Sequence, residues 1–192
     1  RSIRFGGGLE LNSLLMGFAV WLTGLPSSGK STLAGLLAEE LQQRGVRVEV
    51  LDADVVRPLL WPELGYSRED RDENIRRLSI VAQMLVRAGV VTVVAAISPY
   101  RPGRAAARSR IGRFVEVYLD CPVEECIRRD PKGLYKRALA GEISQFTGVS
   151  DPYEPPDAAE VVVMTDQEPP RTSVKKIVEV LIRLGFLPPA SS

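Results

Sequence analysis

The residues with the clearest chemical meaning form a glycine-rich loop near the start of the chain. Positions 24–31 read Gly-Leu-Pro-Ser-Ser-Gly-Lys-Ser, which satisfies the Walker A pattern. In this pattern backbone N–H groups surround phosphate oxygens, the lysine reaches the β and γ phosphates, and the serine hydroxyl binds magnesium. The loop therefore predicts a nucleotide site with Lys30 as a catalytic residue and Ser31 as the metal ligand. The predicted nucleotide-binding set is Gly24, Leu25, Pro26, Ser27, Ser28, Gly29, Lys30, Ser31 and Thr32.

A second group of candidate residues follows the second apolar run of the chain. Residues 52–57 read Asp-Ala-Asp-Val-Val-Arg, which places two carboxylates and an arginine at the carboxyl end of a predicted strand. In a parallel sheet this end faces the phosphate loop, so a phosphoryl acceptor is expected there. Because phosphoryl transfer needs little help from a base, we expect Asp54 to orient the acceptor hydroxyl or to hold a magnesium-bound water. Asp52 either shares this catalytic task or caps the loop.

Alternating strand and helix patterns must position these residues. Uninterrupted apolar or β-branched runs, typical of parallel strands buried on both faces, predict strands at 18–23, 46–51, 90–97, 114–119 and 161–164. Apolar residues at helical spacing predict helices at 31–44, around 75–85, and at 173–184. The sequence thus predicts an α/β P-loop NTPase fold, with a mostly parallel β-sheet between helices.

Residues 130–157 interrupt this alternation. They are rich in glycine, proline and charge, and they show no clear apolar face. A segment of this length inside a compact domain is often a lid, so we predict a mobile lid that is loosely held in the free protein and ordered by ligand contacts. The alternative is an ordinary surface excursion.

The composition narrows the class of protein. With 192 residues and 45% hydrophobic content, the chain can bury one substantial core but is too short for two ordinary domains. A net charge of +1 argues against a nonspecific nucleic-acid binder. Two cysteines and no histidine make neither a disulfide framework nor a usual zinc site, and they favour a reducing, cytoplasmic location. No apolar run reaches the roughly 18 residues that a membrane span needs, so no membrane partner is expected.

The ends of these patterns predict the domain boundaries. Residues 1–16 begin with arginine and contain three consecutive glycines, so we expect a flexible N-terminal segment or linker. The folded domain is predicted over 17–187, and 188–192 are expected to form a C-terminal tail.

Two charged segments are ambiguous when each is taken alone. Residues 64–77 place an aromatic ring, a capping serine and a run of ions on one helix, which is usually a solvated face with ion pairs. Arg104 and Arg108 lie at i, i+4 spacing and are also expected on a solvated helix face. Cys121 and Cys126 are expected to be small buried hydrophobic residues.

Four further segments favour a binding role for these charges. They are Ile-Ser-Pro-Tyr-Arg at 97–101, Arg-Asp-Pro-Lys-Gly-Leu-Tyr at 129–135, Phe-Thr-Gly at 146–148, and Asp-Pro-Tyr-Glu-Pro-Pro at 151–156. In their order and spacing, together with the Walker A loop and residues 52–77, they resemble the adenylylsulfate kinase family of P-loop kinases. The resemblance runs from about residue 18 to about residue 185.

The resemblance implies MgATP as the phosphoryl donor and adenosine 5'-phosphosulfate (APS) as the acceptor. The 3'-hydroxyl of APS would be phosphorylated to give 3'-phosphoadenosine 5'-phosphosulfate in sulfate assimilation. By similarity, Tyr66 and Phe146 hold the adenine of the acceptor between them, and Arg129 flanks the adenine of ATP. The implied acceptor-binding set is Asp54, Arg57, Tyr66, Arg71, Asn74, Ile97, Ser98, Lys132, Leu134 and Phe146. The implied catalytic set is Lys30, Asp52, Asp54 and Lys132.

Two other functions stay open at this point. Another P-loop metabolite kinase, or a nucleotide-binding regulatory domain without turnover, would carry the same loop, whereas the Asn-Lys-x-Asp box of GTPases is absent from the sequence. The chain departs from the family pattern at Ala53, Tyr66, Gly103 and within Pro26-Ser27, and no departure removes a charged or ligating group. A homodimer, and fusion with or supply from an ATP sulfurylase, are the associations that the resemblance brings.

Overall fold

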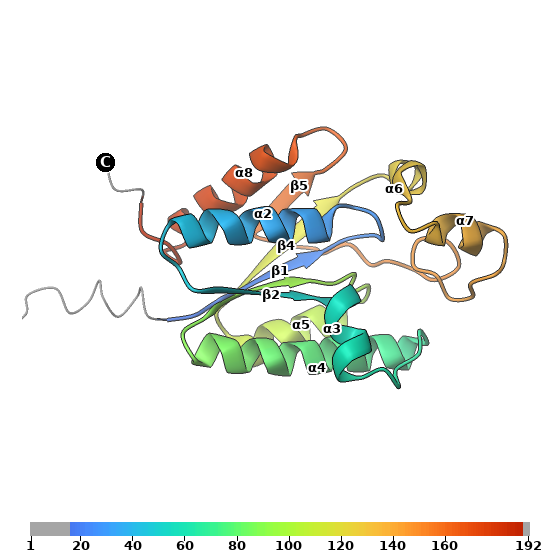
Figure 1. Ribbon diagram of the computed structural model, residues 1–192, viewed down its shortest axis with the longest axis horizontal. Helices are drawn as coiled ribbons and strands as arrows, with labels where there is room; N and C mark the ends of the chain where they lie inside the picture. Colours follow the sequence, from blue (N-terminus) through green and yellow to red (C-terminus); the bar gives the residue numbers. More distant parts are fainter. Residues whose placement is uncertain (1–15, 190–192) are drawn as a thin grey trace, which may run out of the picture.

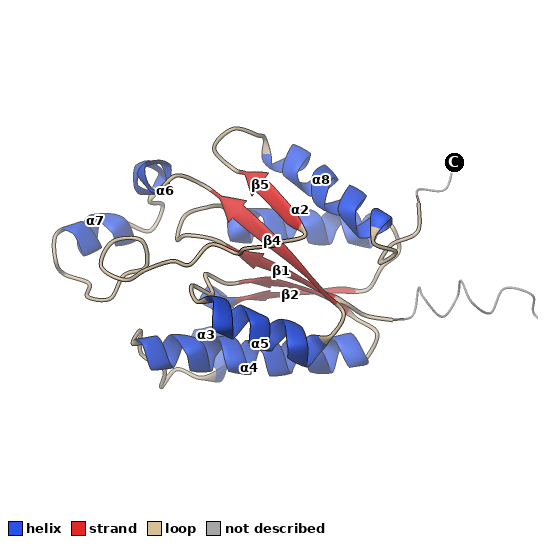
Figure 2. Cartoon of the chain, turned by 180° about the vertical axis from the view of Figure 1, so that it is seen from behind, coloured by secondary structure: helices blue, strands red, loops and turns tan. Residues whose placement is uncertain are grey.

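The computed structural model describes residues 16–189, which form a five-stranded parallel sheet between two layers of helices (Figures 1 and 2). The strand order is β2-β3-β1-β4-β5, so the crossovers are those of an open α/β sheet. The strands are β1 (Ala19–Thr23), β2 (Val48–Asp52), β3 (Val91–Ala95), β4 (Phe114–Asp120) and β5 (Val161–Met164). The predicted α/β P-loop fold is confirmed.

The helices divide into two layers and one outlying pair. One face of the sheet is covered by α2 (Lys30–Gln43) and α8 (Pro170–Arg183). The other face is covered by α3 (Ala53–Leu60), α4 (Arg68–Arg87) and α5 (Arg101–Ile111). Beyond the strand ends lie α6 (Val123–Arg129) and α7 (Leu134–Leu139).

Burial of apolar side chains on both faces holds these layers together. Every residue of β1 and β3 is buried, which explains why their sequences are uninterrupted apolar or β-branched runs. On α2, the residues at helical spacing, Leu33, Leu37 and Leu41, are buried against the sheet, and burying each contributes about 1.5–3 kcal/mol. The sheet is therefore a rigid platform for whatever its edges carry.

The strand register aligns the carboxyl ends that carry the candidate residues. Asp52 pairs with Ala95, Ala95 with Leu22, and Leu22 with Val117. The segments that follow β2, β3 and β1 therefore leave the sheet along one edge. This is the edge beyond which α6 and α7 lie (Figure 1).

The segment 130–157 has a small core of its own, so the expectation that it lacks a core face was wrong. Tyr135 is fully buried and Phe146 is 8% exposed, and both pack with Cys121 and Cys126. The ring centroids of Tyr135 and Phe146 lie 5.0 Å apart in an edge-to-face arrangement. These four residues come from three separate segments, so no periodicity along the chain reveals their cluster. Both cysteines are free and buried, as expected.

Two further expectations concern the chain ends and membranes. Residues 1–15 and 190–192 lie outside the described residues, so the predicted N-terminal linker and most of the predicted tail stay predictions. Among the described helices, none is long and apolar enough to cross a membrane.

Candidate active site

The phosphate loop joins β1 to α2 in a shape that only its glycines permit. A Cβ atom on Gly24 would lie 2.8 Å from the Leu119 carbonyl oxygen and 2.9 Å from Ser28 Oγ. Gly29 has a φ of +97° directly before the first turn of α2, a left-handed conformation that favours glycine. The loop therefore ends with the N-terminus of a 14-residue helix, where backbone N–H groups and the helix dipole attract anions.

Lys30 is folded onto the carbonyl groups of its own loop. Its Nζ donates to the carbonyl oxygens of Gly24 at 3.0 Å and Leu25 at 2.7 Å. Burial lowers the pKa of the Lys30 ammonium to about 8, and the Asp54 carboxylate partly opposes that shift. The remaining predicted residues continue the loop: Pro26 and Ser28 are buried, Ser27 is half-buried, and Ser31 and Thr32 are exposed on the first turn of α2.

Asp54 and Lys132 meet across the edge of the sheet although 78 residues separate them. Lys132 Nζ lies 2.7 Å from Asp54 Oδ2, and this pair raises the pKa of the Lys132 ammonium. Asp52 has a different task, because its carboxylate accepts a hydrogen bond from the Asp54 N–H at 2.9 Å and caps α3. Asp54 thus presents a solvent-accessible carboxylate toward the segment 130–157, beside the phosphate loop.

The two arginines predicted to bind the acceptor, Arg57 and Arg71, lie around one exposed aromatic ring. Arg57 donates to the carbonyl oxygens of Leu64 and Gly65, and its guanidinium lies 4.5 Å from the centroid of the Tyr66 ring. Tyr66 itself is 65% exposed. Arg71 Nε donates to the Tyr66 carbonyl oxygen at 2.9 Å, so both guanidinium groups lie close to the same residue.

Arg71 also joins this surface to the lid segment. It is buried, its Nη1 donates to Thr147 Oγ1 at 2.8 Å, and its Nη2 donates to the Gln145 carbonyl oxygen. On the same helix, Asn74 Oδ1 accepts a hydrogen bond from Trp61 Nε1 at 2.7 Å. The helix face that resembled a solvated stripe therefore carries buried, specifically bonded polar groups.

Ile97 and Ser98 line the same edge as parts of the loop that follows β3. The Ile97 carbonyl oxygen accepts from Thr23 Oγ1 at 2.7 Å, one residue before the phosphate loop. Ser98 Oγ accepts from Trp21 Nε1 at 3.0 Å. Backbone of the predicted acceptor pocket is thus bonded directly to β1, the strand that carries the phosphate loop.

The lid segment touches the phosphate loop through its core. The Tyr135 hydroxyl lies 3.3 Å from the Pro26 carbonyl oxygen. Leu134 begins α7 and is half-buried, while Phe146 packs on Tyr135 rather than standing free. Whether Phe146 also faces the acceptor across from Tyr66 stays a prediction.

Arg129 lies at the end of α6, against the loop that follows β5. Its Nε donates to Glu125 Oε1 at 2.7 Å, and its Nη2 donates to the Thr165 carbonyl oxygen at 2.6 Å. This places the guanidinium beside the segment after a strand end, where the predicted contact with the adenine of ATP would be made.

Sequence reasoning missed a buried charge network on α5 and β4. Arg104 is 3% exposed and Arg108 is half-buried, so the expectation that both are solvated was wrong. The physical reason is Glu116, which lies within β4 and pairs with both arginines. An ionisable residue inside the apolar run 114–119 was the available signal, because a buried carboxylate needs a partner.

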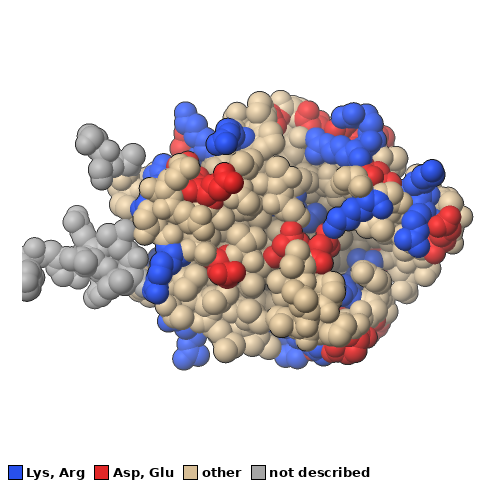
Figure 3. Space-filling model, in the orientation of Figure 1, with Lys and Arg blue, Asp and Glu red and all other residues tan. Residues whose placement is uncertain are grey.

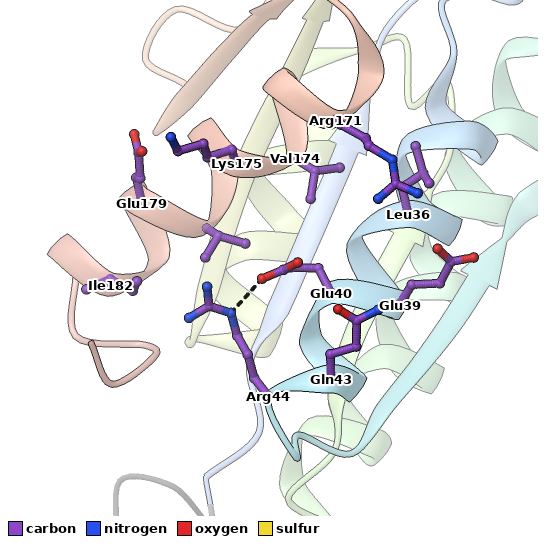
Figure 4. Close-up of a pocket in the computed structure, with 11 residues that line it drawn as sticks. Leu36, Glu39, Glu40, Gln43, Arg44, Arg171, Val174, Lys175, Glu179 and Ile182 are labelled. Carbon is purple, nitrogen blue, oxygen red and sulfur yellow. Dashed lines mark hydrogen bonds and ion pairs between the residues drawn. The ribbon is translucent and has the colours of Figure 1, made fainter. Parts of the chain in front are cut away.

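Charge is evenly mixed over the rest of the visible surface. Figure 3 shows basic and acidic side chains interspersed on the face it presents. A hollow between α2 and α8, lined by Leu36, Glu40, Arg44, Arg171, Val174 and Glu179, lies on a helical face away from the phosphate loop (Figure 4). The residues that line this hollow include none of the predicted site residues.

Comparison with known proteins identifies the family. The family model described as adenylylsulphate kinase matches residues 16–164. The chain belongs to the adenylylsulfate kinase family. It is 51% identical to the adenylyl-sulfate kinase of a Picosynechococcus strain, over 90% of this chain and 98% of the relative. The kinase is therefore an ATP-dependent phosphotransferase of this family, as its segments predicted.

Two further similarities bear on ligands and assembly. The structure of the Mycobacterium tuberculosis APS kinase in complex with AMPPNP and APS superposes with a TM-score of 0.84 at 41% identity, covering 86% of this kinase and 98% of that chain. A relative from Sorangium cellulosum named "Probable bifunctional SAT/APS kinase 2" is 52% identical over 91% of this kinase, which spans 30% of that longer protein.

Proposed function

We propose that this kinase transfers the γ-phosphoryl group of ATP to the 3'-hydroxyl of APS, giving ADP and 3'-phosphoadenosine 5'-phosphosulfate. The observation that carries the proposal is the arrangement at one sheet edge of Lys30 on the phosphate loop and the Asp54–Lys132 pair. The complex of the Mycobacterium tuberculosis enzyme with AMPPNP and APS supports the choice of both ligands.

On the donor side, the phosphate loop would hold the triphosphate by backbone N–H groups and the N-terminus of α2. Lys30 would leave the carbonyl groups of Gly24 and Leu25 and donate to phosphoryl oxygens. Its charge would be matched to the charge that develops in the transition state, which is the main requirement of phosphoryl transfer. Lys30 is half-buried, and its Nζ already lies within the loop that would surround the phosphates.

On the acceptor side, Asp54 would accept a hydrogen bond from the 3'-hydroxyl and orient its oxygen toward the γ-phosphorus. Lys132, already 2.7 Å from Asp54, would move with the lid segment toward the transferring group. Arg57 and Arg71 would offer planar guanidinium groups to the phosphosulfate, and Asn74 would hold the ribose side. Tyr66 and Phe146 would flank the adenine.

The residues present fit a magnesium ion as well. Ser31 is exposed at the start of α2, and Asp54 carries an accessible carboxylate that pairs with Lys132. Within residues 16–189 no group of three His, Cys, Asp or Glu side chains could hold a metal, which suits an ion bound mostly by phosphate oxygens and water. When bound, Mg²⁺ would neutralise charge on the phosphates.

The proposal also covers the cellular location of the kinase, its oligomeric state and the source of its acceptor. We place the kinase in the cytoplasm as a homodimer, with its acceptor supplied by an ATP sulfurylase that is separate or fused. The bifunctional relative from Sorangium cellulosum supports the link with a second activity. The segment 130–157 would act as a lid that closes when both ligands are bound.

An acceptor panel tests the reaction. Purified protein with MgATP is given APS, AMP, gluconate and shikimate separately, and the phosphorylated product of each is quantified. We expect turnover with APS at least about 100-fold above the others, since AMP, gluconate and shikimate lack the phosphosulfate group and therefore its charge-assisted bonds. Faster phosphorylation of another acceptor would overturn the proposal, and binding of ATP without any product would favour a regulatory role.

A further inference from the structure

One buried arginine on α5 bonds the backbone of the acceptor pocket and of the lid at once. Arg104 Nη1 donates to the Ser98 carbonyl oxygen at 2.6 Å, and Nη2 donates to the Glu154 carbonyl oxygen at 2.6 Å. Its Nε donates to Glu116 Oε1 at 2.8 Å. The side chain is 3% exposed, so its guanidinium interacts with protein groups and is not available to an anion in solvent.

Ser98 has a backbone conformation that needs such support. Its φ is +41°, in the left-handed region that residues other than glycine rarely adopt. The hydroxyl of Ser98 is fixed by Trp21 Nε1, and the carbonyl is fixed by Arg104. The neighbouring Ile97 carbonyl is bonded to Thr23. The pocket backbone is therefore held from β1 on one side and from α5 on the other.

Glu154 connects the same guanidinium to the far end of the lid segment. The Glu154 N–H donates to the Pro99 carbonyl oxygen at 2.8 Å, and its carboxylate accepts from the Arg101 N–H at 2.8 Å. With Arg104 on its carbonyl group, the N–H, the carbonyl oxygen and one carboxylate oxygen of Glu154 are all bonded to residues 99–104. The C-terminal end of the lid is thus attached to the acceptor pocket.

The charges around Arg104 are balanced, so the effect of its hydrogen bonds can be tested without changing the net charge of the network. Glu116 also pairs with Arg108 at 3.3 Å, and Arg108 pairs with Glu160 at 2.7 Å. Two cations therefore face two carboxylates. Arg108 shares the network and the helix with Arg104, but its hydrogen bonds go to Glu116 and Glu160 and not to the pocket or lid backbone.

We propose that Arg104 is a positioning residue for the acceptor, which it never touches. Through the Ser98 and Glu154 carbonyl groups it fixes the pocket floor and the lid attachment in one geometry. The inference rests on the proposed function, because the acceptor is taken to be APS. Its predicted effect is on acceptor affinity, while ATP, which binds the loop after β1, is little affected.

The test compares Arg104→Lys with the matched control Arg108→Lys. Both keep the charge and remove a planar fork from the same network, but only the first removes bonds to the pocket and lid. We expect Arg104→Lys to raise the KM for APS about tenfold or more, equivalent to ~1.4 kcal/mol, with the KM for ATP changed less than about twofold. Amide hydrogen exchange at Glu154, whose N–H donates to the Pro99 carbonyl oxygen, should quicken in Arg104→Lys and stay unchanged in Arg108→Lys.

Unchanged APS affinity and unchanged exchange in folded Arg104→Lys, or equal changes in Arg108→Lys, would overturn the inference. If Arg104→Lys does not fold, the double variant Arg104→Met/Glu116→Gln is measured instead, since it keeps the remaining Arg108–Glu160 pair neutral. Failure of the proposed function is distinguishable, because it appears as absent APS turnover in the wild-type protein. The exchange data then decide on Arg104 by themselves.

Discussion

The donor and acceptor sides of the site are built in different ways. The phosphate-binding part of the proposed donor side is one continuous stretch, residues 24–32, and Lys30 bonds to carbonyl groups of that same loop. The proposed acceptor side is assembled from α3, α4, the loop after β3 and the lid segment, and the Arg71–Thr147 hydrogen bond joins residues 76 positions apart. A local site depends on its own residues, whereas a distributed site depends on distant positioning contacts. Mutations should therefore separate the two sides.

The largest effect is expected at the centre of the donor side. Lys30→Ala should leave the fold intact and lower kcat by about 10²–10³, because an ammonium matched to transition-state charge is lost. Steady-state turnover and the thermal midpoint are measured together. Lys136→Ala, which removes an exposed lysine of α7, is the control and should keep full activity. Normal turnover of a folded Lys30→Ala protein would contradict the nucleotide site.

A smaller and selective effect is expected on the acceptor side. Arg57→Ala should weaken APS binding by about 1.5–3 kcal/mol, the range for hydrogen bonds to charged groups, and leave ATP binding almost unchanged. Arg71→Ala should do the same and also lower stability, because Arg71 is buried and bonds to the lid. Calorimetric titration with each ligand measures the split.

The matched control for both arginines is Arg76→Ala. Arg76 lies on α4, is exposed, and pairs with its neighbour Glu73, so its removal should alter neither ligand. Equal weakening of ATP and APS by Arg57→Ala would show that the two sides are not separate.

Substitutions of Phe146 test whether the lid segment belongs to the acceptor side of the site. Phe146→Ala should cost about 1–3 kcal/mol of APS binding if the ring stacks on adenine. Phe146→Leu separates stacking from packing, since leucine keeps apolar volume but has no aromatic face. We expect Leu to restore much of the thermal midpoint and little of the APS affinity. Full recovery of APS affinity by leucine would leave Phe146 as a packing residue beside Tyr135.

The smallest effect is on the pH dependence of the donor side. Lys30 has a pKa of about 8 in the folded protein, against 10.5 for an ordinary lysine. Phosphate binds the charged form, so ATP affinity should fall as the pH rises through about 8, and binding near pH 8.5 should take up a proton. Between these two pKa values the unfolded chain binds more protons, so this residue makes stability rise with pH.

Calorimetry in buffers of different ionisation enthalpy measures the proton uptake. Lys30→Arg is the control, because a guanidinium stays charged throughout this range and should bind ATP without proton uptake. Uptake that persists in Lys30→Arg would assign the titration to another group. APS binding should lack this pH dependence, which again separates the two sides.

The same division explains which features could be predicted from the sequence. The strands were predictable because burial on both faces leaves an unbroken apolar run, as in β1 and β3. The phosphate loop was predictable because its spacing is set by one turn and one helix start. The helix α3 was missed, since it has eight residues, an internal Pro58 and no buried side chain.

The acceptor side could be predicted only in part. Asp54 and Arg57 could be placed near the acceptor because they follow the carboxyl end of a predicted strand, whereas Lys132 came from the family resemblance. The 2.7 Å contact between Asp54 and Lys132 depends on the tertiary fold, which brings together residues 78 positions apart. The pairing of Arg104 with Glu116 was misread for the same reason, because helical spacing says nothing about a carboxylate on a neighbouring strand. Contacts between segments that are distant in the sequence produce no periodic pattern of residue types along the chain.

Gly148 shows what the contact between lid and phosphate loop means for how this protein can evolve. The residue has a φ of +88°, and a Cβ atom there would lie 2.9 Å from Leu25 Cδ2 and 3.4 Å from the Tyr135 hydroxyl. Position 148 belongs to the lid, yet its nearest neighbour is a side chain of the nucleotide loop. A lineage that placed a side chain at this turn would have to adopt a strained backbone and displace the tip of Leu25 in the nucleotide loop in the same step. Inherited changes at position 148 should therefore be limited to those that Leu25 can accommodate.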